Sequence, residues 1–122
     1  MHYRIYHQDL KDIQGRYIPE LLCYGYYEGW CYVIGTTFAG TCLNKKITRS
    51  QKIKAIQALK EIHKRGFLHN DIREENILLD SSGSVYLIDF GMASQHDPKK
   101  QGELFEEEKR QLSRLLDLYY TV

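Results

Sequence analysis

The sequence predicts one α+β domain in which two amphipathic helices and several short strands share a core. Segments rich in β-branched and aromatic residues are short and bounded by glycine or proline, whereas two longer segments repeat apolar residues at helical spacing. The chain has 122 residues, the size of one domain. Its 43% hydrophobic and 27% charged residues are typical of a folded globular protein.

Charge and cysteine content argue against several classes of function. With 17 basic and 16 acidic residues the net charge is +1, which predicts no broad surface for nucleic acid and none for a membrane. The tyrosine-rich stretch 24–32 would suit base stacking, but buried rings with exposed hydroxyls are favoured because no basic residues accompany it. The 3 cysteines contain no CxxC pair, which predicts neither a disulfide framework nor a zinc site. Without an apolar leader or spanning segment, we expect a cytoplasmic protein, with nuclear residence left open.

The first third of the chain predicts a short helix followed by a β-hairpin. Apolar residues recur at mixed helical spacing in residues 3–13, and Gly15 is expected to end this helix. Strands are expected at residues 21–27 and 30–34, where aromatic and β-branched side chains concentrate. The small residues of segment 35–40 then predict a hinge or a close backbone approach.

The middle of the chain predicts the longest helix. Ser50 is expected to cap a helix that continues to Lys64, with apolar residues on one face and lysines on the other. Gly66 suits the left-handed conformation that commonly follows a helix.

A second hairpin is predicted directly after this helix. Strands are expected at residues 77–79 and 85–88 around a polar turn. Asn76 precedes the first strand and Asp89 follows the second, so antiparallel pairing should make them neighbours. Together with Asp71 in the preceding loop, they offer the oxygen ligands that Mg²⁺ prefers.

The last third predicts a polar loop and a closing helix. Residues 92–102 have the composition of a mobile loop. A helix is expected at residues 106–120, with an apolar face formed by Leu112, Leu115, Leu116 and Tyr119.

The residues around this second hairpin resemble a known family. The pattern His69-x-Asp71-x-x-x-x-Asn76, followed by Asp89-Phe90-Gly91, is similar to the catalytic loop and magnesium motif of the eukaryotic-type protein kinases. Weaker similarity extends over residues 3–91 and includes small fungal and bacterial kinase-like proteins. The resemblance implies a protein kinase-like C-terminal lobe at residues 41–122. Residues 1–40 would be a remnant of the N-terminal lobe, made of a helix, a β-hairpin and a hinge.

The resemblance also implies roles for four polar residues. Asp71 would accept or orient the proton of the attacking hydroxyl, and Arg73 would meet the transferring phosphate. Asn76 and Asp89 would hold Mg²⁺ against the phosphates of ATP.

Other positions would be binding or structural residues by the same resemblance. Thr36 and Phe38 would lie in the hinge that carries adenine, and Leu78 would form the floor beneath it. His69 and Phe90 would lock the catalytic loop against the core.

The chain as given also departs from the family pattern. It contains neither a GxGxxG phosphate loop nor the strand lysine that pairs with phosphates, and no Ala-Pro-Glu signature follows Gly91. Asn70 stands where many kinases have an arginine that reads a phosphorylated activation loop, so that regulation is not expected.

Two classes of function remain open on this basis. The first is an ATP- and Mg²⁺-dependent phosphotransferase, acting on a protein Ser/Thr hydroxyl or on a small molecule, as aminoglycoside and lipopolysaccharide kinases do. The second is a pseudokinase-like module that binds nucleotide or a protein partner without catalysis. In either case we expect a second copy or another protein to cover the apolar edge near residues 5–34.

Overall fold

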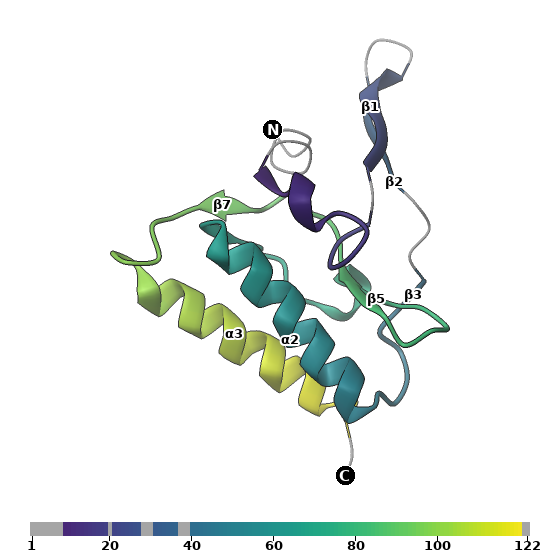
Figure 1. Cartoon of the computed structure of the whole chain (residues 1–122), viewed down its shortest axis with the longest axis vertical. Coiled ribbons are helices and arrows are strands. Elements are labelled where there is room, and N and C mark those ends of the chain that lie inside the picture. The colour runs from purple at the N-terminus through teal and green to yellow at the C-terminus, as the bar shows by residue number, and fades with distance from the viewer. Residues whose placement is uncertain (1–8, 20, 28–30, 37–39, 121–122) are drawn as a thin grey trace.

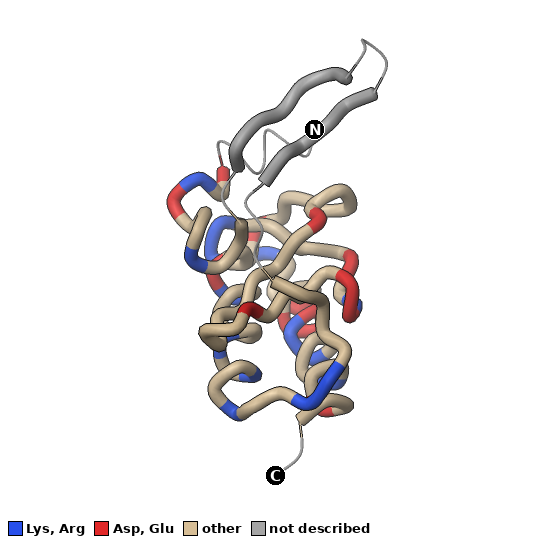
Figure 2. Tube along the Cα trace, turned by 90° about the vertical axis from the view of Figure 1, so that its right-hand side faces the viewer, with Lys and Arg blue, Asp and Glu red and all other residues tan. Residues whose placement is uncertain are grey.

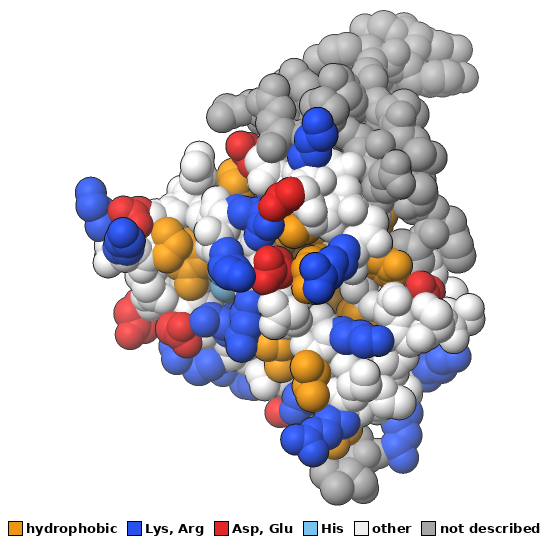
Figure 3. Space-filling view, viewed as in Figure 1, with side chains coloured by type: hydrophobic (Ala, Val, Ile, Leu, Met, Phe, Trp, Pro, Cys, Tyr) orange, Lys and Arg blue, Asp and Glu red, His pale blue; other side chains and the backbone are white. Residues whose placement is uncertain are grey.

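The computed structural model describes residues 9–19, 21–27, 31–36 and 40–120, the backbone alone between 21 and 36. Two long helices, α2 (Arg49–Lys64) and α3 (Gly102–Asp117), run antiparallel side by side in the lower half of the molecule (Figure 1). Along the described trace, acidic and basic residues are interspersed (Figure 2), and both signs are mixed on the face shown in Figure 3. This agrees with the small net charge.

The N-cap of helix α2 lies two residues before the predicted cap. Thr48 is its N-cap: its Oγ1 accepts from the N–H of Gln51 (3.1 Å), and Gln51 Oε1 accepts from the N–H of Thr48 (2.9 Å). The prediction that Ser50 caps the helix was wrong, because this reciprocal pair caps the helix two residues earlier. The C-terminal prediction was correct, since Gly66 has a φ of +84°.

The predicted second hairpin is confirmed and gains a third strand. β5 (Ile77–Leu79) pairs antiparallel with β6 (Val85–Leu87), which ends one residue earlier than expected, and with β3 (Thr41–Cys42). In the turn, Asp80 Oδ1 accepts from the N–H groups of Ser82 and Ser84, which explains the tight reversal.

The predicted first hairpin is confirmed as well. β1 (Leu21–Tyr27) has the expected bounds, and β2 (Cys31–Thr36) begins one residue later and ends two residues later than expected. The two strands extend away from the helices (Figure 1). Of the helix predicted at 3–13, the described part contains only the 3₁₀ helix η2 (Lys11–Ile13), and residues 3–8 lie outside it.

The polar segment after the second hairpin contains a strand that the sequence did not predict. β7 (Ser94–Gln95) pairs antiparallel with β4 (Phe67–Leu68). α3 then begins at Gly102, four residues before the predicted start, and ends at Asp117, three before the predicted end. The short 3₁₀ helix η3 (Glu74–Asn76) leads into β5.

One core joins the start of the described chain to its end. Its buried members include Leu10, Ile18, Leu59, Ile62, Ile77, Leu87, Leu112 and Leu116. The N–H of Leu87 also donates to the backbone oxygen of Tyr17 at 2.9 Å, which ties the segment before β1 to the second hairpin. In the part of the chain described here, no helix is both long and apolar enough to cross a membrane.

Candidate active site

The loop between β4 and β5 contains Asp71, Arg73 and Asn76, three of the four polar residues that the sequence singled out. His69 at its start is fully buried. Its Nδ1 accepts from the N–H of Asp71 (3.2 Å), and its Nε2 donates to the backbone oxygen of Ile88 (2.7 Å). Its ring also packs edge-on against Phe90, with centroids 5.2 Å apart. Because backbone groups occupy both ring nitrogens, His69 fixes the loop against the end of β6.

A hydrogen bond beyond the end of the β5–β6 ladder brings Asn76 next to Asp89. Asn76 is buried, and its backbone oxygen accepts from the N–H of Ile88 at 3.0 Å. Its side-chain Nδ2 donates to the backbone oxygen of Asp71 at 2.8 Å. The two outer ends of the hairpin therefore meet, and the amide of Asn76 holds Asp71 in place beside them.

Asp89 sits in a turn that brings its carboxylate to the surface. Its φ is +62°, a left-handed conformation that aspartate tolerates better than most residues. Its Oδ1 accepts from the N–H of Gly91 at 3.1 Å. Asp89 is exposed while the adjacent Phe90 is buried in the core. The turn thus exposes the carboxylate of Asp89 to solvent, while the buried ring of Phe90 anchors the turn in the core.

The donor chemistry of Asn76 and Asp89 fits a magnesium ion. Asn76 Oδ1 and Asp89 Oδ2 make no hydrogen bond to any residue that the structure describes. Mg²⁺ takes one or two such protein oxygens and completes its shell with phosphate and water oxygens. Among the described residues, no group of three or more His, Cys, Asp or Glu side chains could hold a metal by itself. An ion shared with a nucleotide is therefore what these residues fit.

Arg73 lies beside Asp71 and contacts two carboxylates. Its Nε is 3.2 Å from Asp71 Oδ1 and 3.5 Å from Glu75 Oε2. The side chains of Asp71 and Arg73 are 23% and 55% exposed. The terminal nitrogens of this guanidinium form no ion pair with a described residue, so they remain available for a phosphate.

The residues expected around adenine are described only in part. Thr36 ends β2, where its backbone pairs with Leu21. Phe38 lies outside the described residues. Leu78, half-buried in β5, is flanked by Cys42 of β3 and Tyr86 of β6. The structure thus links Asp71 to Arg73 and Asn76, and it bonds Asn76 to Ile88, the residue before Asp89. An adenine site remains a prediction.

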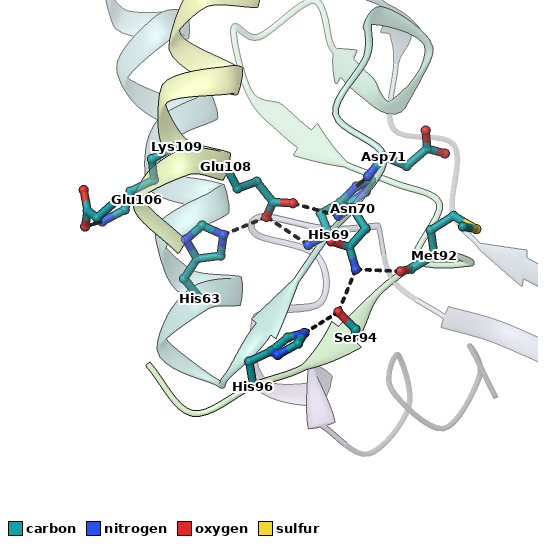
Figure 4. Close-up of polar contacts among 10 residues, drawn as sticks. All are labelled: His63, His69, Asn70, Asp71, Met92, Ser94, His96, Glu106, Glu108 and Lys109. Carbon is teal, nitrogen blue, oxygen red and sulfur yellow. Dashed lines mark hydrogen bonds and ion pairs between the residues drawn. The ribbon is translucent and has the colours of Figure 1, made fainter. Parts of the chain in front are cut away.

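Glu108 is a site residue that the sequence reasoning missed. It is buried in α3, and its Oε1 accepts from the N–H of His69 (2.9 Å) while Oε2 accepts from the N–H of Asn70 (2.7 Å). Oε1 also hydrogen-bonds His63 Nε2 of α2 at 2.8 Å (Figure 4). One carboxylate therefore satisfies two backbone donors of the catalytic loop and joins both long helices to it.

Electrostatics keep Glu108 ionised despite its burial. Burial raises the pKa of Glu108, but the hydrogen bonds from His63, Asn70 and His69 outweigh it and lower the pKa below the ordinary value. His63 is buried too, packs edge-on against Phe105 at 5.0 Å, and its Nδ1 has no hydrogen-bond partner among the described residues. The ionised Glu108 carboxylate thus accepts hydrogen bonds from the buried side of the loop between β4 and β5.

A signal for Glu108 was present in the helical pattern. Phe105, Leu112 and Leu116 form the buried face of α3, and Glu108 lies on that same face at spacings of three and four. A carboxylate on an apolar face is rarely buried unless it is paired, so its position predicts a specific partner. The adjacent Glu106 and Glu107 are exposed, so the residue type alone does not set Glu108 apart from them.

Comparisons with known proteins agree with the motif. The family model described as "Protein kinase domain" matches residues 31–114. Serine/threonine-protein kinase CBK1 of Candida albicans is 41% identical over 66 residues, which cover 51% of this chain and 9% of that protein. A probable casein kinase I homolog of Encephalitozoon cuniculi is 29% identical over 100 residues, which cover 73% of this chain and 31% of that protein.

A solved structure shows a similar fold. The crystal structure of the yeast RNA Pol II CTD kinase CTDK-1 complex contains a chain that matches with a TM-score of 0.53 and 19% identity. The match covers 75% of this chain and 35% of that one. The chain thus spans less than a third of the curated relatives named above and about a third of the solved chain.

Proposed function

Because the chain belongs to the protein kinase domain family, we propose that it is an ATP- and Mg²⁺-dependent phosphotransferase that acts on a Ser/Thr hydroxyl of a protein. One observation carries the proposal. The backbone hydrogen bond between Ile88 and Asn76 brings Asn76 next to Asp89, and Asn76 in turn holds Asp71. Phosphoryl transfer depends mainly on positioning and charge neutralisation, which such a constellation can supply.

Asp71 and Arg73 are the proposed catalytic residues. The Asp71 carboxylate orients the attacking hydroxyl and takes up its proton. Arg73 Nε, at 3.2 Å from Asp71 Oδ1, restricts the orientation of that carboxylate, and its terminal N–H groups face the transferring phosphoryl group.

Asn76 Oδ1 and Asp89 are the proposed magnesium ligands. When bound, the ion neutralises charge on the nucleotide phosphates. Thr36, Phe38 and Leu78 are the proposed contacts of adenine. The proposal also divides the chain at residue 40, with a remnant of the upper lobe before it and the lower lobe after it.

The test is transfer of ³²P from γ-labelled Mg-ATP to casein, and to the chain itself, by wild type and by Asp71→Asn. We expect Asp71→Asn to lower kcat by about 10²- to 10⁴-fold while the melting temperature is unchanged. Glu103→Gln is the matched control, because the Glu103 side chain is 94% exposed and far from the loop in sequence. Turnover by wild type that equals turnover by Asp71→Asn would overturn the proposal.

A binding measurement separates the competing pseudokinase-like function. If Mg-ATP raises the melting temperature of wild type but not of Asp89→Asn, and no transfer occurs, the chain is a nucleotide-binding module. If aminoglycosides but no proteins accept phosphate, the substrate is a small molecule. If Mg-ATP changes neither melting temperature, nucleotide binding is excluded as well.

A further inference from the structure

Asn70 connects the catalytic loop to the segment that follows the metal motif. Its φ is +67°, and this left-handed turn places its side chain beside β7. Nδ2 donates to the backbone oxygen of Met92 (2.8 Å) and to Ser94 Oγ (2.7 Å) (Figure 4). Both hydrogens of the amide group are therefore used on the segment after Asp89.

A chain of hydrogen bonds continues from Ser94 to the start of α3. Ser94 Oγ is 2.8 Å from His96 Nε2, and His96 Nδ1 is 2.9 Å from Oε1 of Gln101, the N-cap of α3. With Gln101 Oε1 as acceptor, Nδ1 carries the proton, so the neutral ring accepts from the Ser94 hydroxyl at Nε2. Every donor along the chain then points from the catalytic loop towards α3.

The backbone of Asn70 is tied to the same helix. Its N–H donates to Glu108 Oε2 at 2.7 Å, while its side chain reaches the α3 N-cap through Ser94 and His96. The N–H of His96 also donates to the backbone oxygen of Gly66 at 2.7 Å. Asn70 is thus linked to α3 twice, through its backbone N–H to Glu108 and through its side chain by way of Ser94 and His96.

We infer that Asn70 and Ser94 are positioning residues that keep the segment 92–101 docked on the catalytic loop without any phosphate. A phosphorylated loop is docked by pairing a phosphate with a cation, and that contact is switched by modification. The Asn70–Ser94 contact joins an amide to a hydroxyl, so docking is built into the unmodified chain. Because Met92 lies three residues after Asp89, docking also restricts where the Asp89 carboxylate can move.

Hydrogen exchange tests the docking directly. Asn70→Gly removes the side chain and still tolerates a φ of +67°, and Ser94→Ala removes the hydroxyl alone. We expect either change to speed exchange of the His96 amide roughly 5- to 10-fold. The double variant should add little to either single change, since both break one contact. Ser94→Thr keeps a hydroxyl and should retain protection, and Gln95→Ala is the neighbouring control.

Three results would overturn the inference. They are exchange rates within twofold of wild type in both single variants, fully additive effects in the double variant, and a failure of Ser94→Thr to retain protection. Whether docking needs a phosphate is tested with wild type treated with phosphatase, and mass spectrometry checks that no phosphate remains. If this protein exchanges as fast as Ser94→Ala and slows only when Ser94 is phosphorylated, docking is not intrinsic.

A kinetic readout rests on the proposed function, whereas the exchange experiment does not. Ser94→Ala should lower kcat about 3- to 10-fold without changing KM for ATP, and Ser94→Thr should restore it. An unchanged kcat in Ser94→Ala would show that docking does not position Asp89. If wild type transfers no phosphate, the proposed function fails and the exchange rates still decide the docking.

Discussion

His63 of α2 and Glu108 of α3 form a 2.8 Å hydrogen bond between two buried side chains. The same Oε1 atom of Glu108 accepts from the N–H of His69, so the helix contact and the loop contact share one oxygen. The ionised carboxylate of Glu108 therefore stabilises the loop between β4 and β5 from its buried side. Substituting Glu108 tests this stabilisation without changing any side chain on the exposed side of the loop.

Glu108→Gln should destabilise the protein by about 3 kcal/mol, because a buried pair loses its charge and two backbone donors lose a charged acceptor. The NH₂ group of the glutamine would also face the backbone N–H of His69 or Asn70, so two hydrogen-bond donors would point at each other. Urea unfolding measures the change. Glu107→Gln is the control, since Glu107 is exposed and loses only surface ion pairs with Arg110 and Arg114. Its free energy of unfolding should differ from that of wild type by at most about 1 kcal/mol. Equal unfolding free energies for Glu108→Gln and Glu107→Gln would contradict the supporting role.

Acidification should remove the contribution of Glu108. Its folded-state pKa lies below its ordinary value of 4.5, so the stabilisation is fully present above that pH and is lost as pH falls through the folded pKa. The difference in unfolding free energy between wild type and Glu108→Gln should therefore shrink as pH falls below 4.5. Other acidic groups cancel in this difference. A difference that stays constant to the acid end would exclude an ionised Glu108.

Thr48→Ala should cost about 1 kcal/mol, because α2 loses the side-chain acceptor of its capping box. Ser50→Ala, two residues later and inside the first turn, should change stability by less than about 0.5 kcal/mol. Thermal unfolding of the two variants compares the cap found in the structure with the cap expected from sequence. A lower melting temperature for Ser50→Ala than for Thr48→Ala would indicate that Ser50 is the cap.

Gly40→Ala should be the most damaging glycine substitution of those discussed here. Gly40 has a φ of +126°, and a Cβ atom there would lie 2.2 Å from the backbone oxygen of Leu79, which cannot move without opening the β3–β5 pairing. We expect a loss of about 2–4 kcal/mol. Gly83→Ala is the matched case: its φ is +89° but no atom lies within 4 Å of the added Cβ, so only the backbone cost of about 1 kcal/mol remains. Equal losses, measured by urea unfolding, would exclude the close approach at Leu79.

Elements defined by a repeated pattern could be predicted from sequence. The apolar stripe of α2 and the short apolar runs on either side of the Asp80 turn are visible in the sequence, so helix and hairpin were found with small errors at their ends. The proximity of Asn76 and Asp89 followed from antiparallel pairing alone. The resemblance to the protein kinases, and not the pairing, added Asp71 and Arg73 to this pair.

Features that depend on one contact could not be predicted in this way. β4 and β7 have two residues each, too few to show any alternation, and they form because Gly66 and His96 bring them together. Ser50 and Thr48 are chemically similar caps, and only the partner Gln51 decides between them. The role of Glu108 could not be predicted because the sequence shows its charge but not the three donors that face it.

One core contains residues from both ends of the described chain, Leu10 and Ile18 together with Leu112 and Leu116. This arrangement has a consequence for biosynthesis. A chain still being translated holds its first apolar residues for about a hundred positions before their last partners appear. Until α3 has left the ribosome, the side of α2 that packs on α3 has no cover, although β6 can already pack against α2. The core that the structure describes can therefore form completely only after α3 has emerged.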